Sequence, residues 1–149
     1  MPVMQLQTIG CTVREFEVDD LKAVLLVEEA AFGTKRLSET ELINRIRAND
    51  VLVLQRGSAL LGYAVFELRK QSIFLQRIAV SSPLCGFGAT LMADIKRRML
   101  SSGRSRVETI VDEYDVASQK FFNRCGLRAV RILPKDRSKY LFRMTREQA

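Results

Sequence analysis

The chain has 149 residues, of which 47% are hydrophobic, and it carries a formal net charge of +7 from 24 Lys and Arg against 17 Asp and Glu. This length suits one compact domain. No apolar run approaches the roughly 18 residues of a membrane span, and the N-terminus lacks a signal-peptide layout. We therefore expect a cytoplasmic protein with no membrane partner. Histidine is absent and Cys11, Cys85 and Cys125 are scattered, which argues against a metal site, a disulfide framework and a nucleophile–histidine pair.

The first part of the chain predicts a strand followed by a helix. We expect a loose terminus over residues 1–9 and a single domain over residues 10–146. Alternating apolar residues predict a strand over residues 11–17, and Asp19 or Asp20 can cap a helix that ends near residue 32.

Glu28 falls on the apolar stripe of this first helix. An acidic residue on such a stripe has two readings. It can lie at the edge of the stripe and reach solvent, or it can project into a polar site at the end of the helix. The sequence leaves both readings open.

The next segment predicts a second helix and three consecutive strands. Ser38 and Glu41 form a capping-box pattern that opens a helix to about Asn49. Strands over residues 51–55 and 59–68 flank a polar turn and read as an antiparallel hairpin. A third strand over residues 73–80 continues the meander.

A turn with two glycines follows the third strand of the meander. Gly86 and Gly88 lie where a helix over residues 86–100 begins. The first turn of a helix has N–H groups without internal partners and carries the positive end of the helix dipole, so this turn can hold an anion such as a phosphate. A plain tight turn, with glycines serving only backbone conformation, explains the pattern equally well.

The remaining chain predicts three strands and one helix. The strands lie over residues 107–111, 127–133 and 140–144, and the helix over residues 115–124 closes at Gly126. The complete order is β-α-α-β-β-β-α-β-α-β-β. We therefore expect a mixed α/β (α+β) fold with a central, mostly antiparallel mixed sheet of about seven strands and four helices.

This order of elements, together with several short motifs, resembles the GNAT superfamily of acyl-CoA-dependent N-acyltransferases. The nearest likeness is to the ribosomal-protein-alanine acetyltransferase subgroup, and it covers nearly the whole chain. The motifs that carry it are Glu28-x-x-x-Phe32, Leu61-Gly62-Tyr63, Ile78-Ala79-Val80 and Ala117…Phe121-Phe122…Gly126-Leu127.

The resemblance implies that acetyl-CoA is the co-substrate, and the absence of histidine and the scattered cysteines lead us to expect no metal. In the family the fourth strand splays from the fifth, so that backbone groups at the end of the fourth strand pair with the pantetheine arm, and the glycine turn presents N–H groups to the pyrophosphate. The cofactor-binding residues implied in this way are Ile78, Ala79, Val80, Leu84, Cys85, Gly86, Phe87, Gly88, Ala89, Asp115 and Phe122.

The chain departs from the family pattern at four positions that bear on the chemistry. Pro83 stands where the phosphate loop has a basic residue, and Phe122 where the family has a tyrosine that protonates the leaving thiolate. Asp115 replaces an asparagine, and Ile110 replaces the glutamate that serves as the general base in the subgroup. A general acid is typically worth roughly 10²–10⁴ in rate.

Glu28 and Tyr114 are the residues that we name as catalytic candidates, from their expected nearness to the reaction centre in the family fold. Glu113 and Tyr140 are weaker candidates. Each has a simpler explanation: Glu113 can be a solvated strand end, Tyr114 a packing ring and Tyr140 an ordinary strand residue. Cys125 is better explained as a small buried residue than as a nucleophile.

The positive charge favours acidic ligands such as phosphorylated cofactors, nucleic acid or acidic protein surfaces. The basic residues are spread along the chain with few aromatics between them, so solubility is an equally good explanation, and nucleic acid is the least expected partner.

We expect an N-acetyltransferase acting on a primary amine of a protein N-terminus, a ribosomal protein, a lysine or a small molecule, as a monomer or homodimer. The alternative is a catalytically impaired GNAT-like module that binds CoA or a protein or RNA partner.

Overall fold

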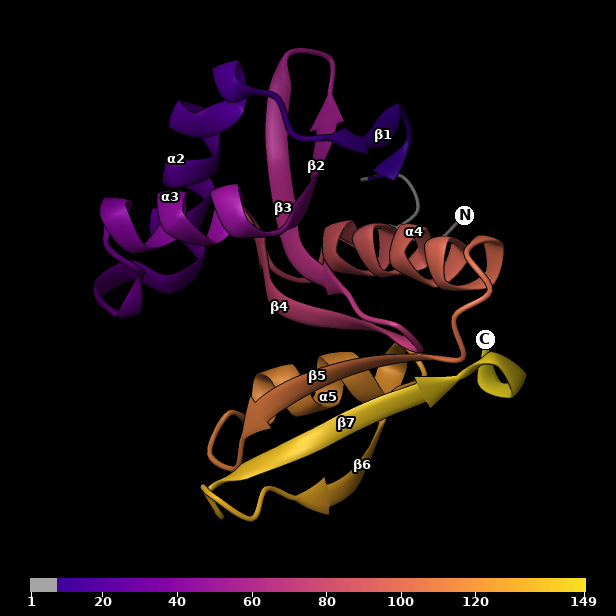
Figure 1. Ribbon diagram of the computed structural model, residues 1–149. Coiled ribbons are helices and arrows are strands. Elements are labelled where there is room, and N and C mark those ends of the chain that lie inside the picture. Colours follow the sequence, from indigo (N-terminus) through magenta and orange to yellow (C-terminus); the bar gives the residue numbers. More distant parts are fainter. Residues whose placement is uncertain (1–7) are drawn as a thin grey trace. The chain divides into compact units, whose positions relative to one another are not determined.

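The computed structural model describes residues 8–149 (Figure 1). The α-helices are α2 (Leu21–Phe32), α3 (Glu39–Ala48), α4 (Phe87–Ser101) and α5 (Val116–Arg124), and the strands are β1 (Cys11–Glu15), β2 (Asp50–Arg56), β3 (Ala59–Leu68), β4 (Ser72–Val80), β5 (Arg106–Asp112), β6 (Arg128–Ile132) and β7 (Lys139–Thr145). Short 3-10 helices occupy Val18–Asp20, Gly33–Lys35 and Arg146–Gln148. The expected loose terminus at residues 1–9 lies, except for its last two residues, outside the described residues.

The strands form one seven-stranded sheet in the order β1-β2-β3-β4-β5-β7-β6. The β1–β2, β2–β3, β5–β7 and β6–β7 pairs are antiparallel, and β4–β5 is parallel, with Ser72–Leu75 opposite Arg106–Thr109. The predicted mixed, mostly antiparallel sheet and the predicted order of elements are therefore confirmed.

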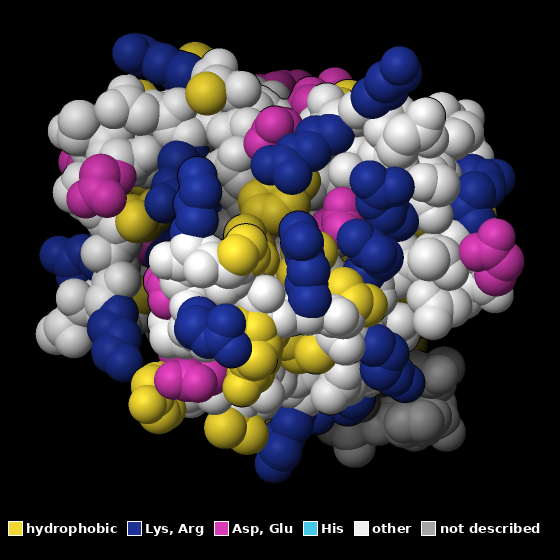
Figure 2. Space-filling view, turned by 60° about the horizontal axis from the view of Figure 1, so that its bottom comes forward, with side chains coloured by type: hydrophobic (Ala, Val, Ile, Leu, Met, Phe, Trp, Pro, Cys, Tyr) yellow, Lys and Arg dark blue, Asp and Glu magenta, His cyan; other side chains and the backbone are white. Residues whose placement is uncertain are grey.

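Lys and Arg side chains are spread over the face shown in Figure 2, with hydrophobic side chains between them and fewer Asp and Glu. Among the described residues, no helix is long and apolar enough to cross a membrane.

Contacts divide the chain into two compact units. Among the described residues, the first, here called unit 1, comprises residues 8–66 and 77–94, and unit 2 comprises residues 67–76 and 95–149. Strands β3 and β4 and helix α4 each contribute to both units.

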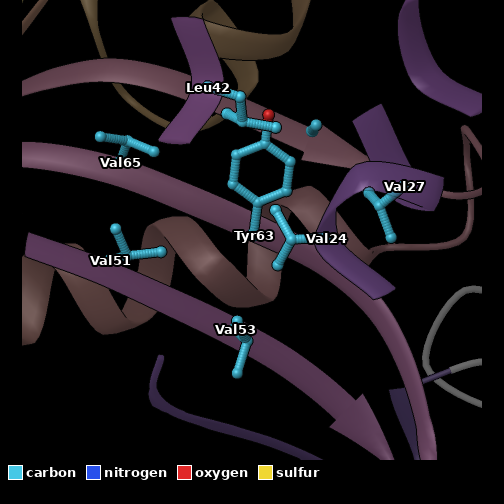
Figure 3. Packing of buried hydrophobic residues seen from close by; sticks show 8 residues of the cluster. Val24, Val27, Leu42, Val51, Val53, Tyr63 and Val65 are labelled. Carbon is cyan, nitrogen blue, oxygen red and sulfur yellow. The ribbon is translucent and has the colours of Figure 1, made fainter. Parts of the chain in front are cut away.

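The core of unit 1 lies between two helices and a hairpin. Val24 and Val27 of α2 and Leu42 of α3 point toward alternate residues of β2 and β3, among them Val53 and Tyr63 (Figure 3). These side chains are at most 3% exposed. Because full burial of an aliphatic side chain contributes about 1.5–3 kcal/mol, this cluster holds α2 and α3 on one face of the hairpin.

The opposite face of the same hairpin is also buried. Leu52 and Leu54 of β2 and Ala64 of β3 are fully covered, and Gly62 lies against Leu91 of α4. Burial on both faces explains why the sequence of β2 is a continuous apolar run without alternation.

In unit 2 helix α5 packs on one face of the β5–β7 pair. Figure 1 shows α5 behind these strands, and the rings of Phe122 and Phe142 lie 6.4 Å apart, centre to centre. Gly126, with φ of +97°, ends the helix beside Met144. The predicted left-handed glycine at the end of this helix is confirmed.

The local predictions at the helix starts have different outcomes. Ser38 accepts a hydrogen bond from the Glu41 amide at 3.1 Å, as the capping pattern predicts. The prediction that Asp19 or Asp20 caps the first helix is wrong, because α2 has no side-chain cap. Asp20 instead forms an ion pair with Arg14 at 2.8 Å and accepts a hydrogen bond from the Glu17 amide.

Candidate active site

The loop between β4 and α4 has an unusual backbone. Leu84 has φ of +61° and Gly86 has φ of +80°. Leu84 is the one residue other than glycine with positive φ among the described residues. Left-handed residues alternating with others turn successive N–H groups toward one side of the chain, which is how backbone loops bind anions.

Helix α4 begins directly after this loop. Its first helical hydrogen bond runs from the Thr90 amide to the Gly86 carbonyl at 3.0 Å, and the Thr90 hydroxyl donates to the same oxygen at 2.9 Å. The amides of Phe87, Gly88 and Ala89 precede that bond, so the helix directs them outward with the positive end of its dipole. The loop and helix start therefore suit a phosphate, although Pro83 supplies no N–H.

Gly62 of β3 lies very close to the end of β4. A Cβ built on Gly62 would be 3.0 Å from the Ala79 carbonyl oxygen and 3.2 Å from Val80. The Ser81 amide donates to the Leu61 carbonyl at 2.9 Å. A methyl group at this position would be in tighter contact than most side chains, so β4 would have to shift by a few tenths of an ångström, and glycine allows the close approach of the two strands.

A positive charge lies beside the start of α4. The guanidinium carbon of Arg56, at the end of β2, is 5.9 Å from the ring centre of Phe87. The loop itself contains no basic residue. Arg56 is 31 positions before Phe87 in the sequence, which is why the loop motif could not identify it.

Glu28 lies at the centre of a buried network in unit 1. Its carboxylate accepts hydrogen bonds from Arg77 at 2.5 and 2.8 Å, from the Leu37 amide at 2.8 Å and from the Tyr63 hydroxyl. Glu28 is 1% exposed. The reading in which Glu28 reaches solvent at the edge of the stripe is therefore wrong, and the polar-site reading holds.

The pKa of the Glu28 carboxyl follows from these neighbours. Burial alone would raise it, but the hydrogen bonds from Arg77, Tyr63 and the Leu37 amide outweigh burial and hold the pKa below its ordinary value. Burial and the neighbouring carboxylate raise the pKa of Tyr63. Glu28 is thus a carboxylate at neutral pH and Tyr63 a neutral hydrogen-bond donor.

Arg77 is held on its other side by an aromatic ring. Its guanidinium carbon is 3.9 Å from the ring centre of Phe32, the last residue of α2. The network therefore ties together α2, β3, β4 and the chain just before α3. Phe32 and Tyr63 belong to the motifs found in the sequence, whereas Arg77 was not singled out.

The predicted site residues of unit 2 lie at the start of α5. The Asp115 carboxylate caps the helix by accepting from the Ser118 amide at 3.1 Å. Tyr114 is 82% exposed, and its amide donates to Asp112 at 2.9 Å. A hydrogen bond to Glu113 raises the pKa of the Tyr114 hydroxyl. Tyr114 is therefore an exposed phenol that stays protonated at neutral pH.

Three further positions singled out in the sequence carry no charged group. They are Phe122 and Cys125, which are buried, and Ile110, which is apolar. Phe122 is 5% exposed and its ring meets that of Phe121 edge-on at 5.1 Å. Burial raises the pKa of the Cys125 thiol, which favours the expected reading of a buried structural cysteine. Ile110 lies on β5 and is exposed.

A second locked carboxylate lies two residues before Ile110. Glu108 accepts from Arg143 at 2.9 and 3.0 Å and from Arg106 at 3.0 Å. Burial would raise the pKa of Glu108, but the two arginines more than compensate and hold it below its ordinary value. Glu108 therefore serves to neutralise arginines within the sheet.

Comparison with known proteins places this arrangement in a family. The profile of the acetyltransferase (GNAT) family matches residues 18–127. The chain belongs to the GNAT family. The matched residues include the motif at Glu28, the glycine loop and helix α5, so the family resemblance read from the sequence is confirmed and assigns acetyl transfer to this chain.

Solved structures share the fold at low sequence identity. The ribosomal-protein-S18-alanine N-acetyltransferase from Escherichia coli is 16% identical, with a TM-score of 0.77 over 91% of this chain and 93% of that chain. Ard1 from Thermoplasma volcanium is 18% identical, with a TM-score of 0.77 over 91% and 97%.

A further structure of the same fold is a complex with coenzyme A. PaiA N-acetyltransferase from Thermoplasma acidophilum is 16% identical, with a TM-score of 0.75 over 91% of this chain and 99% of that chain. No curated protein matches the sequence. Within residues 8–149 there is no cluster of three or more Cys, Asp or Glu side chains that could hold a metal ion.

Proposed function

We propose that this GNAT chain is an acetyl-CoA-dependent N-acetyltransferase that acts on a primary amine, with a protein N-terminus as the first acceptor class to test. The match of the family profile over residues 18–127 carries the proposal. The fold shared with a ribosomal-protein-alanine N-acetyltransferase supports this acceptor class. The cytoplasmic location and the oligomeric state remain predictions.

In this proposal acetyl-CoA binds along the end of β4 and the start of α4. Backbone groups of Ile78 to Val80 pair with the pantetheine arm, and the amides of residues 84–89 hold the pyrophosphate. Asp115 and Phe122 of unit 2 are further cofactor-binding residues that the family resemblance implies. The outward first-turn amides of α4 support this assignment. Arg56 supplies the positive charge that Pro83 cannot.

The reaction moves one acetyl group. The neutral amine attacks the thioester carbonyl, an N–C bond forms and the C–S bond breaks. The proton lost by nitrogen passes to water or a base, and the CoA thiolate takes up a proton. Tyr114 is our candidate for that second proton transfer because its phenol is exposed and protonated at neutral pH.

Glu28 was also predicted to be catalytic, and its surroundings favour a narrower role. A carboxylate with three donors and a lowered pKa is a weak base. We propose that Glu28 acts mainly through the chain that it holds, by fixing Leu37 and Arg77. A loss of kcat in Glu28→Gln at unchanged folded stability would favour a direct role in proton transfer.

The proposal is tested by following acetyl transfer from labelled acetyl-CoA to a library of peptides with free N-termini. Mass spectrometry identifies the acetylated atom, and the same peptides with blocked N-termini are the matched control. We expect N-terminal acetylation by the wild-type chain and at least tenfold slower transfer by Tyr114→Phe. Acetylation of the blocked peptides on lysine would overturn the N-terminal assignment, and absence of transfer to any amine would overturn the enzyme assignment.

A second candidate function is binding of CoA without turnover. It is favoured by Phe122, which is packed between Phe121 and Phe142 and has no hydroxyl to protonate a thiolate. In that case acetyl-CoA binds, no amine is acetylated, and Phe122→Tyr gains measurable transfer. Turnover by the wild-type chain would exclude this candidate.

A further inference from the structure

Strand β6 is the last strand of the sheet and is exposed over its whole length. It follows β7 in the strand order, so its other edge has no strand beside it among the described residues. All five residues of β6 are exposed, including Val130 and Ile132 at 46% each. An edge strand offers its backbone groups to another extended chain.

The side chains of β6 present different chemistry on the two faces of the sheet. Arg131 lies opposite Leu141 of β7, and Ile132 lies opposite Tyr140. Consecutive strand residues point to opposite faces, so a chain added beside β6 would meet a cation on one face and an apolar side chain on the other.

The face that carries Arg131 also carries an excess of positive charge. In the register, Leu141 pairs with Ile110 and Lys139 with Asp112. By the register, the charged residues on this face are Arg106, Glu108, Asp112, Arg128, Arg131, Lys139 and Arg143, five Lys or Arg against two Asp or Glu. Glu108 and Asp112 are engaged with Arg106, Arg143 and Lys139, whereas Arg131 has no ion pair within residues 8–149.

We propose that the β6 edge is a docking strand for an extended acidic segment of a partner protein, in which acidic and apolar side chains alternate. Backbone hydrogen bonds to β6 give the contact its register, the acidic side chains face Arg131, and the apolar ones cover Ile132. This is strand addition with charge complementarity.

The same features disfavour the other partners that a basic edge could take. A second copy would bring Arg131 against like charges, and the irregular register at Val130 already interrupts regular pairing. Single-stranded nucleic acid needs aromatic side chains on which bases stack, and the aromatic residues of β7, Tyr140 and Phe142, fall in the register opposite Val111 and Thr109, away from Arg131.

The test is the binding of a labelled peptide in which Glu and Val alternate to the full chain, followed by fluorescence anisotropy. A peptide with Gln in place of Glu is the ligand control, and Arg47→Glu, an equally exposed change on α3, is the protein control. We expect the wild-type chain to bind the peptide with an affinity that falls as the salt concentration rises. The substitution Arg131→Glu should weaken this binding by about fivefold to tenfold. Ile132→Ser should weaken binding about threefold, because apolar contact is lost.

Several outcomes would overturn the proposal. These are equal binding by wild type and Arg131→Glu, equal binding of the Gln peptide, stronger binding of an RNA oligonucleotide, and self-association of the chain through β6 in sedimentation. Circular dichroism checks that each variant is folded. The experiment needs no turnover, and titration of Arg131→Glu with acetyl-CoA, expected to be unchanged, separates its outcome from that of the proposed acetyl transfer.

Discussion

Each unit contains one carboxylate that is locked by arginine, and the two differ in how far solvent reaches them. Glu28 in unit 1 is 1% exposed, and the side chain of its partner Arg77 is 16% exposed. Glu108 in unit 2 is 7% exposed, but the side chains of Arg106 and Arg143 are 36% and 35% exposed. The carboxylate is therefore buried in both units, but its arginine partner is largely buried in unit 1 and its arginine partners are partly exposed in unit 2.

This difference teaches what each pair does. Glu28 receives donors from β3, β4 and the main chain before α3, so it connects parts of the chain that are distant in sequence. Glu108 binds side chains of its own strand and of the neighbouring strand β7. A buried pair that loses one member leaves a charge that water cannot reach, whereas an exposed pair is screened.

The largest expected effect is the loss of Arg77. Arg77→Ala leaves Glu28 buried without its cation, and we expect the free energy of unfolding to fall by about 3–5 kcal/mol. Urea denaturation measures the change, with Arg47→Ala on the exposed face of α3 as the control. A loss below about 1 kcal/mol would show that solvent reaches Glu28 and would remove the contrast between the two units.

Tyr63→Phe sharpens the comparison, because it removes one donor and keeps the volume of the ring. We expect the free energy of unfolding to fall by about 1.5–3 kcal/mol, the range for a hydrogen bond to a charged group. The matched change is Tyr140→Phe in β7, which should have little effect. Equal losses in the two variants would mean that the Tyr63 hydroxyl contributes nothing specific.

Glu108→Gln should have a smaller effect than either change in unit 1. Because its two arginine partners remain partly solvated, we expect the free energy of unfolding to fall by about 1 kcal/mol. The same denaturation experiment measures it. A loss of unfolding free energy as large as that of Arg77→Ala would indicate that the ion pairs of Glu108 stabilise the fold as strongly as the buried pair of Glu28 and Arg77.

Acid sensitivity gives a further comparison. The pKa values of Glu28 and Glu108 are both below the ordinary value of 4.5. The unfolded chain therefore takes up these protons first as pH falls, and the stability from both groups, complete above about pH 4.5, is lost as pH falls through the lowered values. We expect the free energy of unfolding of the double variant, Glu28→Gln with Glu108→Gln, to fall less steeply than that of the wild type as pH drops below about 4.5. An unchanged limb would contradict the assigned pairs.

The sequence predicted the fold well and the network around Glu28 poorly. Alternation in the strands and the capping pattern at Ser38 are local signals, and they placed the elements within a few residues. The partners of Glu28 lie 35 and 49 positions away at Tyr63 and Arg77. No local pattern marks such a pairing, so the sequence alone could not decide between the two readings of Glu28.

The glycine loop before α4 was predicted in position but not in detail. The glycine turn and the start of α4 follow from local chemistry, whereas the positive φ at Leu84 and the nearness of Arg56 to Phe87 depend on packing. The assignment of individual residues to acetyl-CoA rests on family likeness and remains a prediction.

The most direct test of the central claim is calorimetric titration with acetyl-CoA of the wild type, Gly88→Glu and Thr40→Glu. Gly88→Glu adds a carboxylate to the first turn of α4, where the helix dipole tolerates it but a pyrophosphate would be repelled. Thr40→Glu adds the same charge to the first turn of α3. Binding by the wild type and Thr40→Glu, with loss of binding in Gly88→Glu, is the predicted result. No binding by the wild type, or equal binding by all three, would contradict an acetyl-CoA site at the start of α4.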